Sequence, residues 1–305
     1  MSGILNINKP RGPTSFDIVR AVRRGTGEKR VGHAGTLDPA ASGVLLILLG
    51  QASRITEYLM DLPKVYRAVV RLGVATTTYD AEGEVTARNK VSVSERRLRD
   101  VLIEFVGEIQ QTPPTYSALK IEGQPAYRLA RRGEALEMKP RPVRVYGVDL
   151  LTFDAPDAEI EVECGRGTYI RSLAHDIGQA LGCDAHLAAL ERTRIGPFTV
   201  EHALPMDDIA ADFADGTWRE YVQPMDGGLI NLPALTVPIE DEKDLRHGQA
   251  VDLDTDAATG RLSECPDRLE ARGYAEDGSL IGILHYDAAI AMWRPRKIFA
   301  REAAR

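Results

Sequence analysis

The sequence has 305 residues, of which 44% are hydrophobic, 27% charged and 6% aromatic, a composition typical of folded globular proteins. Its longest apolar run, residues 44–49, is far shorter than the ~20 residues that span a bilayer, and residues 1–10 lack the apolar centre of a signal peptide. The three cysteines, Cys164, Cys183 and Cys265, fit neither a disulfide framework nor the close cysteine pairs of zinc sites. Fibrous, disordered and membrane classes are therefore excluded, and a cytoplasmic protein with reduced cysteines is expected.

The net charge of -7 is unevenly distributed along the chain. Residues 1–200 hold 27 Lys and Arg against 24 Asp and Glu, a balance of +3, whereas residues 201–305 hold 11 against 21, a balance of -10. Basic residues cluster at 20–30 and 128–144, where they either face phosphate or lie on a solvated helix surface. Charge alone does not separate these two possibilities.

Hydrophobic spacing predicts interleaved strands and helices through the first 200 residues. A strand is expected at 3–6, then a helix at 15–24 that Thr14 or Ser15 caps and Gly25 ends. A glycine-rich loop at 32–43, a strand at 44–49, a helix from Ser53 and an extended segment at 65–74 follow. Helices are expected at 94–105, 126–132 and 169–181, and paired strands at 143–153 and 159–164.

Because the elements do not follow a strict strand–helix–strand rhythm, the sequence favours an α+β fold with a mixed, largely antiparallel sheet. From about residue 231 the composition changes to two prolines, an acidic run at 240–244 and short β-like segments at 249–253, 268–275 and 280–284. We therefore expect two domains, residues 1–230 and a small β-rich domain at 231–305.

The sequence contains no phosphate-binding glycine loop, no His-Glu-x-x-His zinc motif and no serine-hydrolase elbow, and its six histidines include no close pair suited to one metal. Residues 32–43, Gly-His-Ala-Gly-Thr-Leu-Asp-Pro-Ala-Ala-Ser-Gly, are more informative, since they hold Asp38 between glycines and a following proline. On its residues alone, this segment is either a simple turn, the commoner case, or a loop that presents a carboxylate.

This segment resembles the nucleophile loop of TruB-type pseudouridine synthases. Further segments match the same family in the same order: Asn8-Lys9-Pro10-Arg11-Gly12, Lys64-Val65-Tyr66-Arg67, Asp80-Ala81-Glu82-Gly83, Tyr116-Ser117-Ala118-Leu119-Lys120, Gly167-Thr168-Tyr169-Ile170-Arg171 and Leu190-Glu191-Arg192-Thr193. The resemblance covers about residues 3–200 and, more loosely, the remainder. It implies a catalytic domain of pseudouridine synthase type followed by a small PUA-like RNA-binding domain.

The activity that this resemblance implies is isomerisation of uridine to pseudouridine at T-loop position 55 of tRNA, by a cytoplasmic monomer without metal or cofactor. Asp38 corresponds to the nucleophile, and Arg171 to the arginine that pairs with it and keeps it ionised. Tyr66, which by its pattern alone would be a core residue, corresponds to a tyrosine that stacks on the target base and has been considered for proton transfer. The remaining residues expected to contact substrate are His33, Tyr169, Leu190, Lys9 and Asp80.

The chain departs from the family pattern at a few positions. Thr77 stands at the first acidic position of the common Thr-Asp-Thr-x-Asp pattern, Arg166 stands where lysine is common, and Ala40 where a larger apolar residue is often found. These differences affect expected substrate contacts rather than the reaction. In the acidic C-terminal part, phosphate contact is expected only from a local patch of Arg294, Arg296, Lys297 and Arg301.

Two other functions remain open from sequence. One is a tRNA-binding or tRNA-folding protein whose action needs no catalysis, and the other is a guide-RNA-dependent synthase subunit of a ribonucleoprotein particle. An Asp38→Asn variant separates the first from an enzyme, and activity of the isolated chain on bare tRNA excludes a need for guide RNA.

Overall fold

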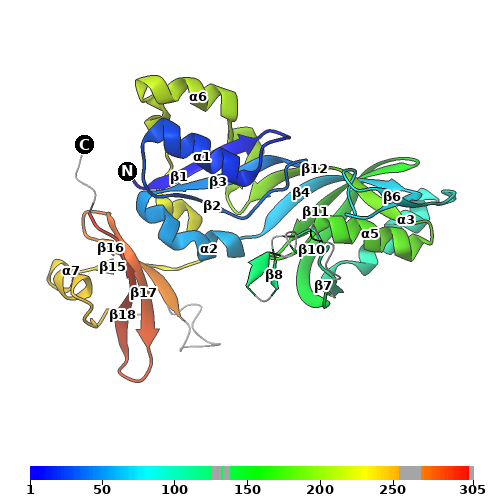
Figure 1. The fold of residues 1–305 in the computed structure, drawn as a ribbon. Coiled ribbons are helices and arrows are strands. Elements are labelled where there is room, and N and C mark those ends of the chain that lie inside the picture. The colour runs from blue at the N-terminus through cyan, green and yellow to red at the C-terminus, as the bar shows by residue number, and fades with distance from the viewer. Residues whose placement is uncertain are drawn as a thin grey trace.

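The computed structural model describes residues 1–117, 119–121, 123–125, 129, 132, 138–253 and 269–301. Within these residues one large mixed sheet and one small four-stranded sheet form the two parts seen in Figure 1. The strands of the large sheet are β1 (Gly3–Lys9), β2 (Val31–Ala34), β3 (Ser42–Leu49), β4 (Lys64–Leu72), β7 (Gly107–Gln111), β10 (Arg141–Asp154), β11 (Asp157–Cys164), β12 (Ala185–Ile195), β13 (Phe198–Thr199) and β14 (Leu204–Pro205).

The helices and short strands surround this sheet. The α-helices are α1 (Ser15–Thr26), α2 (Thr56–Asp61), α3 (Glu95–Glu104), α5 (Ile170–Leu181), α6 (Met206–Asp215) and α7 (Ile239–Arg246). Short 3-10 helices are η1 (Gly50–Ile55), η2 (Val200–His202), η3 (Thr217–Tyr221) and η4 (Met225–Gly228), and two hairpins are β5 (Val74–Thr76) with β6 (Val85–Arg88) and β8 (Lys120–Ile121) with β9 (Gln124–Pro125).

The large sheet has the strand order β14-β1-β3-β12-β4-β11-β10-β7, with β2 paired to β3 and β13 to β12. Its pairs are antiparallel except β1 with β14 and β3 with β12. The predicted α+β class with a mixed, largely antiparallel sheet is confirmed. The parallel contact of β3 with β12 brings the end of the predicted glycine-rich loop beside residues 191 and 192.

Helix α1 begins where the sequence predicted and ends two residues later. Thr14 and Asp17 form a reciprocal capping box, and Gly27, at a φ of 71°, ends the helix. Gly25, predicted as the end, lies inside the helix. A Cβ at Gly25 would lie 2.1 Å from the Phe213 ring, so this glycine allows α6 to pack closely on α1. This tertiary contact could not be predicted from local sequence patterns, because Phe213 lies far along the chain.

Two further predictions needed correction. Residues 31–34, which overlap the start of the loop predicted at 32–43, form strand β2. They do so because they pair with β3 on the edge opposite to β1. The helix predicted from Ser53 is a 3-10 turn from Gly50 followed by the short helix α2. The helix predicted at 126–132 falls almost entirely outside the described residues.

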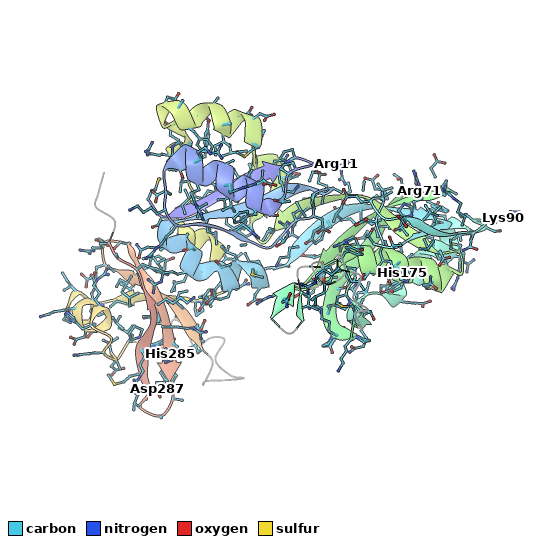
Figure 2. All side chains as sticks on the ribbon, viewed as in Figure 1. Arg11, Arg71, Lys90, His175, His285 and Asp287 are labelled. Atoms are coloured by element: carbon cyan, nitrogen blue, oxygen red, sulfur yellow. The ribbon has the colours of Figure 1, made fainter. Side chains whose placement is uncertain are left out.

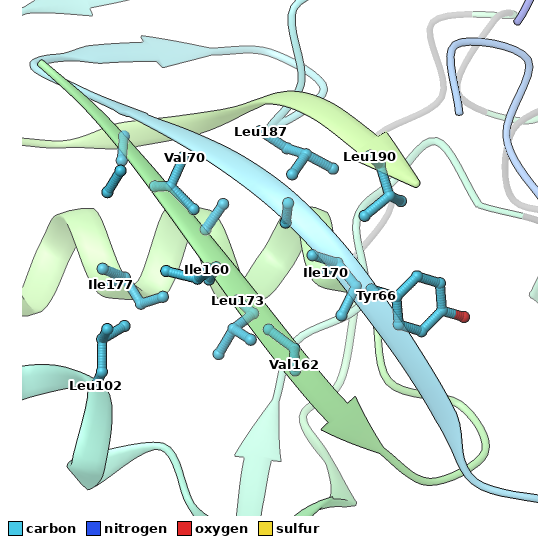
Figure 3. Close-up of a cluster of buried hydrophobic side chains, with 14 of the residues drawn as sticks. Tyr66, Val70, Leu102, Ile160, Val162, Ile170, Leu173, Ile177, Leu187 and Leu190 are labelled. Atoms are coloured by element: carbon cyan, nitrogen blue, oxygen red, sulfur yellow. The ribbon is translucent and has the colours of Figure 1, made fainter. Parts of the chain in front are cut away.

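The main core lies between the sheet and the helices α3 and α5. Helix α5 turns Ile170, Leu173, Ala174 and Ile177 toward the sheet, a spacing that places them on one helix face. Figure 3 shows Ile170, Leu173 and Ile177 against Val70, Ile160 and Val162 of the central strands, with Tyr66 and Leu190 at one edge of the cluster. The first turn of α5 therefore lies next to two residues that were predicted to contact substrate.

The small sheet has the order β15 (Ala234–Val237), β16 (Glu270–Ala275), β17 (Leu280–Asp287) and β18 (Met292–Ile298). A β-rich C-terminal part was predicted and is confirmed. The acidic run at 240–244, however, forms helix α7, and residues 249–253 contribute only an isolated bridge between Val251 and Trp293. Helix α7 was missed because acidic residues in the first turn of a helix resemble a solvated loop.

Candidate active site

The Asp38 loop, residues 35–41, connects β2 to β3. Gly35 leaves β2 at a φ of 90°, a conformation that favours glycine. The hydroxyl of Ser15, the first residue of α1, donates to the carbonyl of Leu37 at 3.0 Å and accepts from its N–H at 2.9 Å. The backbone beside Asp38 is thus held in place, while 42% of the Asp38 side chain stays exposed.

Lys9 lies beneath this loop and has no exposed surface. Its ammonium donates to the carbonyls of Pro10 at 2.8 Å, Pro13 at 2.9 Å and Pro39 at 3.4 Å. Burial lowers the pKa of Lys9 to about 8, against the opposing effect of the Asp38 carboxylate. Since all three donors of the ammonium are directed at these carbonyls, the structure places Lys9 in the support of the Asp38 loop and not on a surface that substrate could touch.

Arg171, in the first turn of α5, is the partner of Asp38. Its Nε lies 3.0 Å from Asp38 Oδ2, and its Nη2 donates to the carbonyl of Tyr116 at 3.0 Å. Only 8% of the Arg171 side chain is exposed. A buried guanidinium held in this way fixes the orientation of the carboxylate that it contacts.

Asp80 contacts the same guanidinium from the other side. Its Oδ2 lies 3.3 Å from Arg171 Nη1, and its Oδ1 accepts from the Thr78 hydroxyl and from the N–H of Glu82. The preceding residue, Tyr79, has a φ of 62° and stacks on His175 of α5 at 4.1 Å between ring centroids. Asp80 thus shares the Arg171 guanidinium with Asp38 and lines a small hollow with Asp38, Arg171 and Leu190, but it does not line the larger cavity described next; a contact between Asp80 and substrate stays a prediction.

A cavity of about 600 Å³ opens beside Asp38 and is large enough for a nucleotide. Among the described residues that line it, Asp38 is the only acid; the others are Gly35, Thr36, Leu37, Met60, Lys64, Tyr66, Leu119, Gly165, Arg166, Gly167, Thr168, Tyr169, Ile170, Arg171, Leu190 and Arg192. Of the residues predicted from sequence, the cavity brings together Asp38, Arg171, Tyr66, Tyr169 and Leu190.

Tyr66, on β4, lies in the cavity wall with 9% of its surface exposed. Burial raises the pKa of its phenol, so the hydroxyl stays protonated at neutral pH. A protonated phenol on an aromatic ring can stack on a planar base and donate a hydrogen bond to it. Both roles agree with the predicted substrate contact.

Tyr169 precedes α5 and is held through its backbone. The buried amide of Gln111 accepts from the Tyr169 N–H at 2.8 Å and donates to its carbonyl at 3.1 Å. The guanidinium of Arg141 lies 5.2 Å from the Tyr169 ring centroid and donates to the carbonyl of Gly167 at 2.9 Å. Tyr169 is thereby fixed as part of the cavity wall, which also includes Leu190, 8% exposed on β12.

Arg192 is a cavity residue that the sequence reasoning missed. It is 1% exposed, and its guanidinium donates to the carbonyls of Val44 at 2.8 Å, Gly35 at 3.2 Å and Thr36 at 3.4 Å. It therefore joins β12 to both ends of the Asp38 loop. The available signal was its position two residues after Leu190, because residues two apart on a strand face the same side of a sheet; strand β12 itself was not predicted from the sequence.

His33 does not line the cavity. It lies on β2, and its buried Nδ1 has no hydrogen-bond partner among the described residues. Burial and the nearby Arg192 lower the pKa of His33, so its ring is neutral at pH 7. A contact between His33 and substrate stays a prediction.

The chain is similar to known proteins over nearly its whole length. Residues 23–170 match the model of the TruB family pseudouridylate synthase (N terminal domain), and residues 171–230 match the tRNA pseudouridylate synthase B C-terminal domain. A protein of Dehalococcoides mccartyi named tRNA pseudouridine synthase B is 40% identical over 304 residues, which is 99% of this chain and 98% of that protein. The protein of the same name from Pseudomonas aeruginosa is 41% identical over 286 residues, covering 93% and 91%.

The chain belongs to the TruB family of pseudouridylate synthases. Among solved structures, this TruB family member is similar to a Cbf5-Nop10-Gar1 complex, with a TM-score of 0.72 and 28% identity over 93% of this chain and 78% of that chain. It is also similar to an H/ACA RNP bound to a substrate RNA containing 2'-deoxyuridine, with a TM-score of 0.74 and 25% identity over 98% and 85%. Both likenesses extend over the small sheet as well as the large one.

The described residues contain neither a metal-binding cluster nor a membrane-spanning helix. No group of three or more His, Cys, Asp or Glu side chains in this part of the chain is arranged to hold a metal ion. No helix among the same residues is long and apolar enough to cross a membrane.

Proposed function

We propose that this chain isomerises uridine to pseudouridine at T-loop position 55 of tRNA, with Asp38 as the nucleophile. The observation that carries the proposal is the 3.0 Å contact of Asp38 with Arg171 at a nucleotide-sized cavity whose lining contains no second acid among the described residues. The names of the curated relatives support tRNA as the substrate.

The proposed reaction breaks the bond between ribose C1′ and uracil N1 and forms a bond between C1′ and C5 of the same uracil. The proton at C5 leaves and N1 gains one, so the atoms balance without an oxidant or reductant. Asp38 forms a transient bond, either to the sugar or to the base ring, which is broken again as the base rejoins the sugar.

One carboxylate suffices for this reaction. Glycosidases use two carboxylates, because one protonates the leaving group while the other either activates a water molecule or attacks the sugar. Here the base is both leaving group and later nucleophile, so no water needs activation. Tyr66, Tyr169 and Leu190 would hold the uracil while it rotates, and their contacts would offset the few kcal/mol that extruding a base costs.

An Asp38→Asn variant tests the assignment of the nucleophile. We expect the rate of pseudouridine formation in a T-arm stem-loop to fall by at least about 10³-fold while the RNA still binds, because the amide keeps the shape of the carboxylate without its charge. Asp100→Asn, which removes an exposed carboxylate from α3, is the matched control and should retain the wild-type rate. Conversion by Asp38→Asn at the wild-type rate would show that another group is the nucleophile.

We further propose that residues 1–230 form the catalytic domain, that residues 231–305 form a PUA-like RNA-binding domain, and that the protein acts as a cytoplasmic monomer. The end of the family match at residue 230 and the start of the small sheet at Ala234 support the boundary. Incubating the purified chain with bare tRNA transcript tests independence from guide RNA and partner proteins. Lack of conversion until guide RNA is added would favour a guide-dependent synthase.

A further inference from the structure

The small C-terminal sheet shares a hydrophobic core with the catalytic part. Ile283 of β17 and Phe299, which follows β18, belong to one buried cluster with Ala52, Ile55 and Leu59 of η1 and α2. Phe299 is 1% exposed and Ile283 has no exposed surface. In Figure 1, α2 lies between the two sheets. The small sheet is therefore packed onto η1 and α2 and is not merely tethered by a linker.

Polar contacts join the same surfaces. The Tyr58 hydroxyl donates to Glu270 Oε2 at 2.7 Å, and the Lys297 ammonium contacts the Glu57 carboxylate and the carbonyl of Arg54. Arg54 in turn donates to the carbonyl of Ile298. The Gln51 side chain accepts from the Ala300 N–H at 2.7 Å and donates to its carbonyl at 2.9 Å.

Helix α2 leads directly into the wall of the cavity. Its penultimate residue, Met60, lines the cavity, as does Lys64 at the start of β4. The Lys64 ammonium donates to the carbonyls of Met60 and Leu62, and two residues further along β4 lies Tyr66. A helix of six residues has little stability of its own, so its position depends on what packs against it.

Four basic side chains in or just after β18 are engaged in ion pairs. Arg294 pairs with Asp287 at 2.9 Å, Arg296 with Glu270, Lys297 with Glu57, and Arg301 with Asp277 at 3.0 Å. These four are the residues that the sequence suggested as a phosphate-binding patch. Each of these four side chains already has a carboxylate beside it, which lowers the net positive charge that the patch offers to phosphate.

We propose that the small sheet positions α2, and thereby the Met60–Lys64 wall of the cavity, so that it acts on the catalytic step more than on RNA affinity. Tyr58 and Lys297 are the positioning residues that transmit this effect. The inference rests on the proposed function only in taking the cavity as the reaction site.

The double variant Tyr58→Phe, Lys297→Met tests it in the full chain. We expect the single-turnover rate at saturating T-arm RNA to fall by about tenfold or more, since small misplacements of a site are costly, while the Kd for that RNA changes less than about twofold. Arg294→Met is the matched control, because its partner Asp287 lies at the far tip of the small sheet, away from α2 (Figure 2). It should keep the wild-type rate and Kd.

An exchanged ion pair separates positioning from general loss of structure. Glu57→Lys alone should lower the rate, and Glu57→Lys with Lys297→Glu should restore most of it. Amide hydrogen exchange provides a readout independent of activity: in the first double variant, residues 56–61 should exchange faster while β16 and β17 stay protected.

Three results would overturn the inference. One is an unchanged single-turnover rate in the double variant Tyr58→Phe, Lys297→Met. Another is an unchanged rate together with a raised Kd for the RNA and a shallower salt dependence of binding, which would make Lys297 a phosphate contact. The third is unchanged hydrogen exchange in α2 of the double variant, a measurement that does not depend on activity. If the wild-type protein forms no pseudouridine in the T-arm RNA, the proposed function is wrong, and hydrogen exchange in α2 then decides the role of the small sheet by itself.

Discussion

At the scale of residues, Asp38 supplies a carboxylate that substrate can reach, and Arg171 holds this carboxylate in a fixed orientation. Asp38 retains 42% exposure and so keeps part of its hydration, whereas Arg171 is 8% exposed and held by Asp80 and the carbonyl of Tyr116. The guanidinium is thus fixed before any substrate arrives. Resemblance supplied both residues from sequence, but the role of Asp80 as a second partner of Arg171 required coordinates, since nothing in residue order shows which carboxylates share a guanidinium.

The buried ammonium of Lys9 gives a prediction about pH. Burial lowers the Lys9 pKa from 10.5 to about 8, so between these values the unfolded chain binds more protons than the folded protein. The contribution of Lys9 to the free energy of unfolding should therefore rise with pH across this window, by at most about 1.4 kcal/mol per pH unit. Urea unfolding of the wild type and Lys9→Met across the window measures the difference. Lys29→Met, at an exposed lysine, is the control, and wild-type and Lys9→Met curves that stay parallel would contradict the prediction.

At the scale of elements, the Asp38 loop is assembled from segments that the sequence describes well one at a time. The capping of α1, the strand at β3 and the first turn of α5 follow from local patterns, because capping residues and hydrophobic spacing act within a few positions. Strand β2 and the end of α1 did not follow, because their causes are pairing with β3 and contact with Phe213 of α6. Local propensity carries no information about either partner.

Gly43 of β3 lies very close to the backbone of β12. It has a φ of 104°, and a Cβ there would lie 2.3 Å from the carbonyl oxygen of Arg192. Gly12 has a φ of 109° but open space around its position, so Gly12→Ala isolates the backbone strain, about 1–3 kcal/mol. Gly43→Ala should cost at least about 1 kcal/mol more, because β12 must also move. Chemical denaturation measures the free energy of unfolding of both variants. Equal decreases would mean that the close approach of Gly43 to β12 does not affect stability.

At the scale of the whole molecule, charge separates the two parts of the chain. Residues 1–200 carry +3 and residues 201–305 carry -10. Among the described residues, Arg294, Arg296, Lys297 and Arg301 are paired with carboxylates, whereas Arg24 at the end of α1 and Lys29 and Arg30 just after it form no ion pair within this part of the chain. Phosphate contact is therefore expected mainly from the catalytic part.

Salt dependence tests this distribution. We expect the logarithm of the association constant for T-arm RNA to fall with the logarithm of salt concentration, with a slope of roughly -3 or steeper, as several phosphates lose their counterions. Arg24→Gln with Arg30→Gln should make the slope shallower, whereas Asp38→Asn should leave it unchanged. Fluorescence anisotropy at several salt concentrations measures these slopes, and a flat wild-type profile would refute phosphate-driven binding.

The sequence by itself determined the α+β class, the family, and several elements of the catalytic part, among them α1, β3, β4, α3, β10, β11 and α5, because hydrophobic period, caps and ordered motifs are local properties of the chain. Tertiary structure alone decided that Lys9 supports the loop, that Asp80 shares the Arg171 guanidinium with Asp38, that Arg192 joins β12 to the Asp38 loop, and that the small sheet packs on α2. Each of these depends on a partner that is distant in sequence. Burial and pairing of charges arise only when the folded chain brings such partners within a few ångströms.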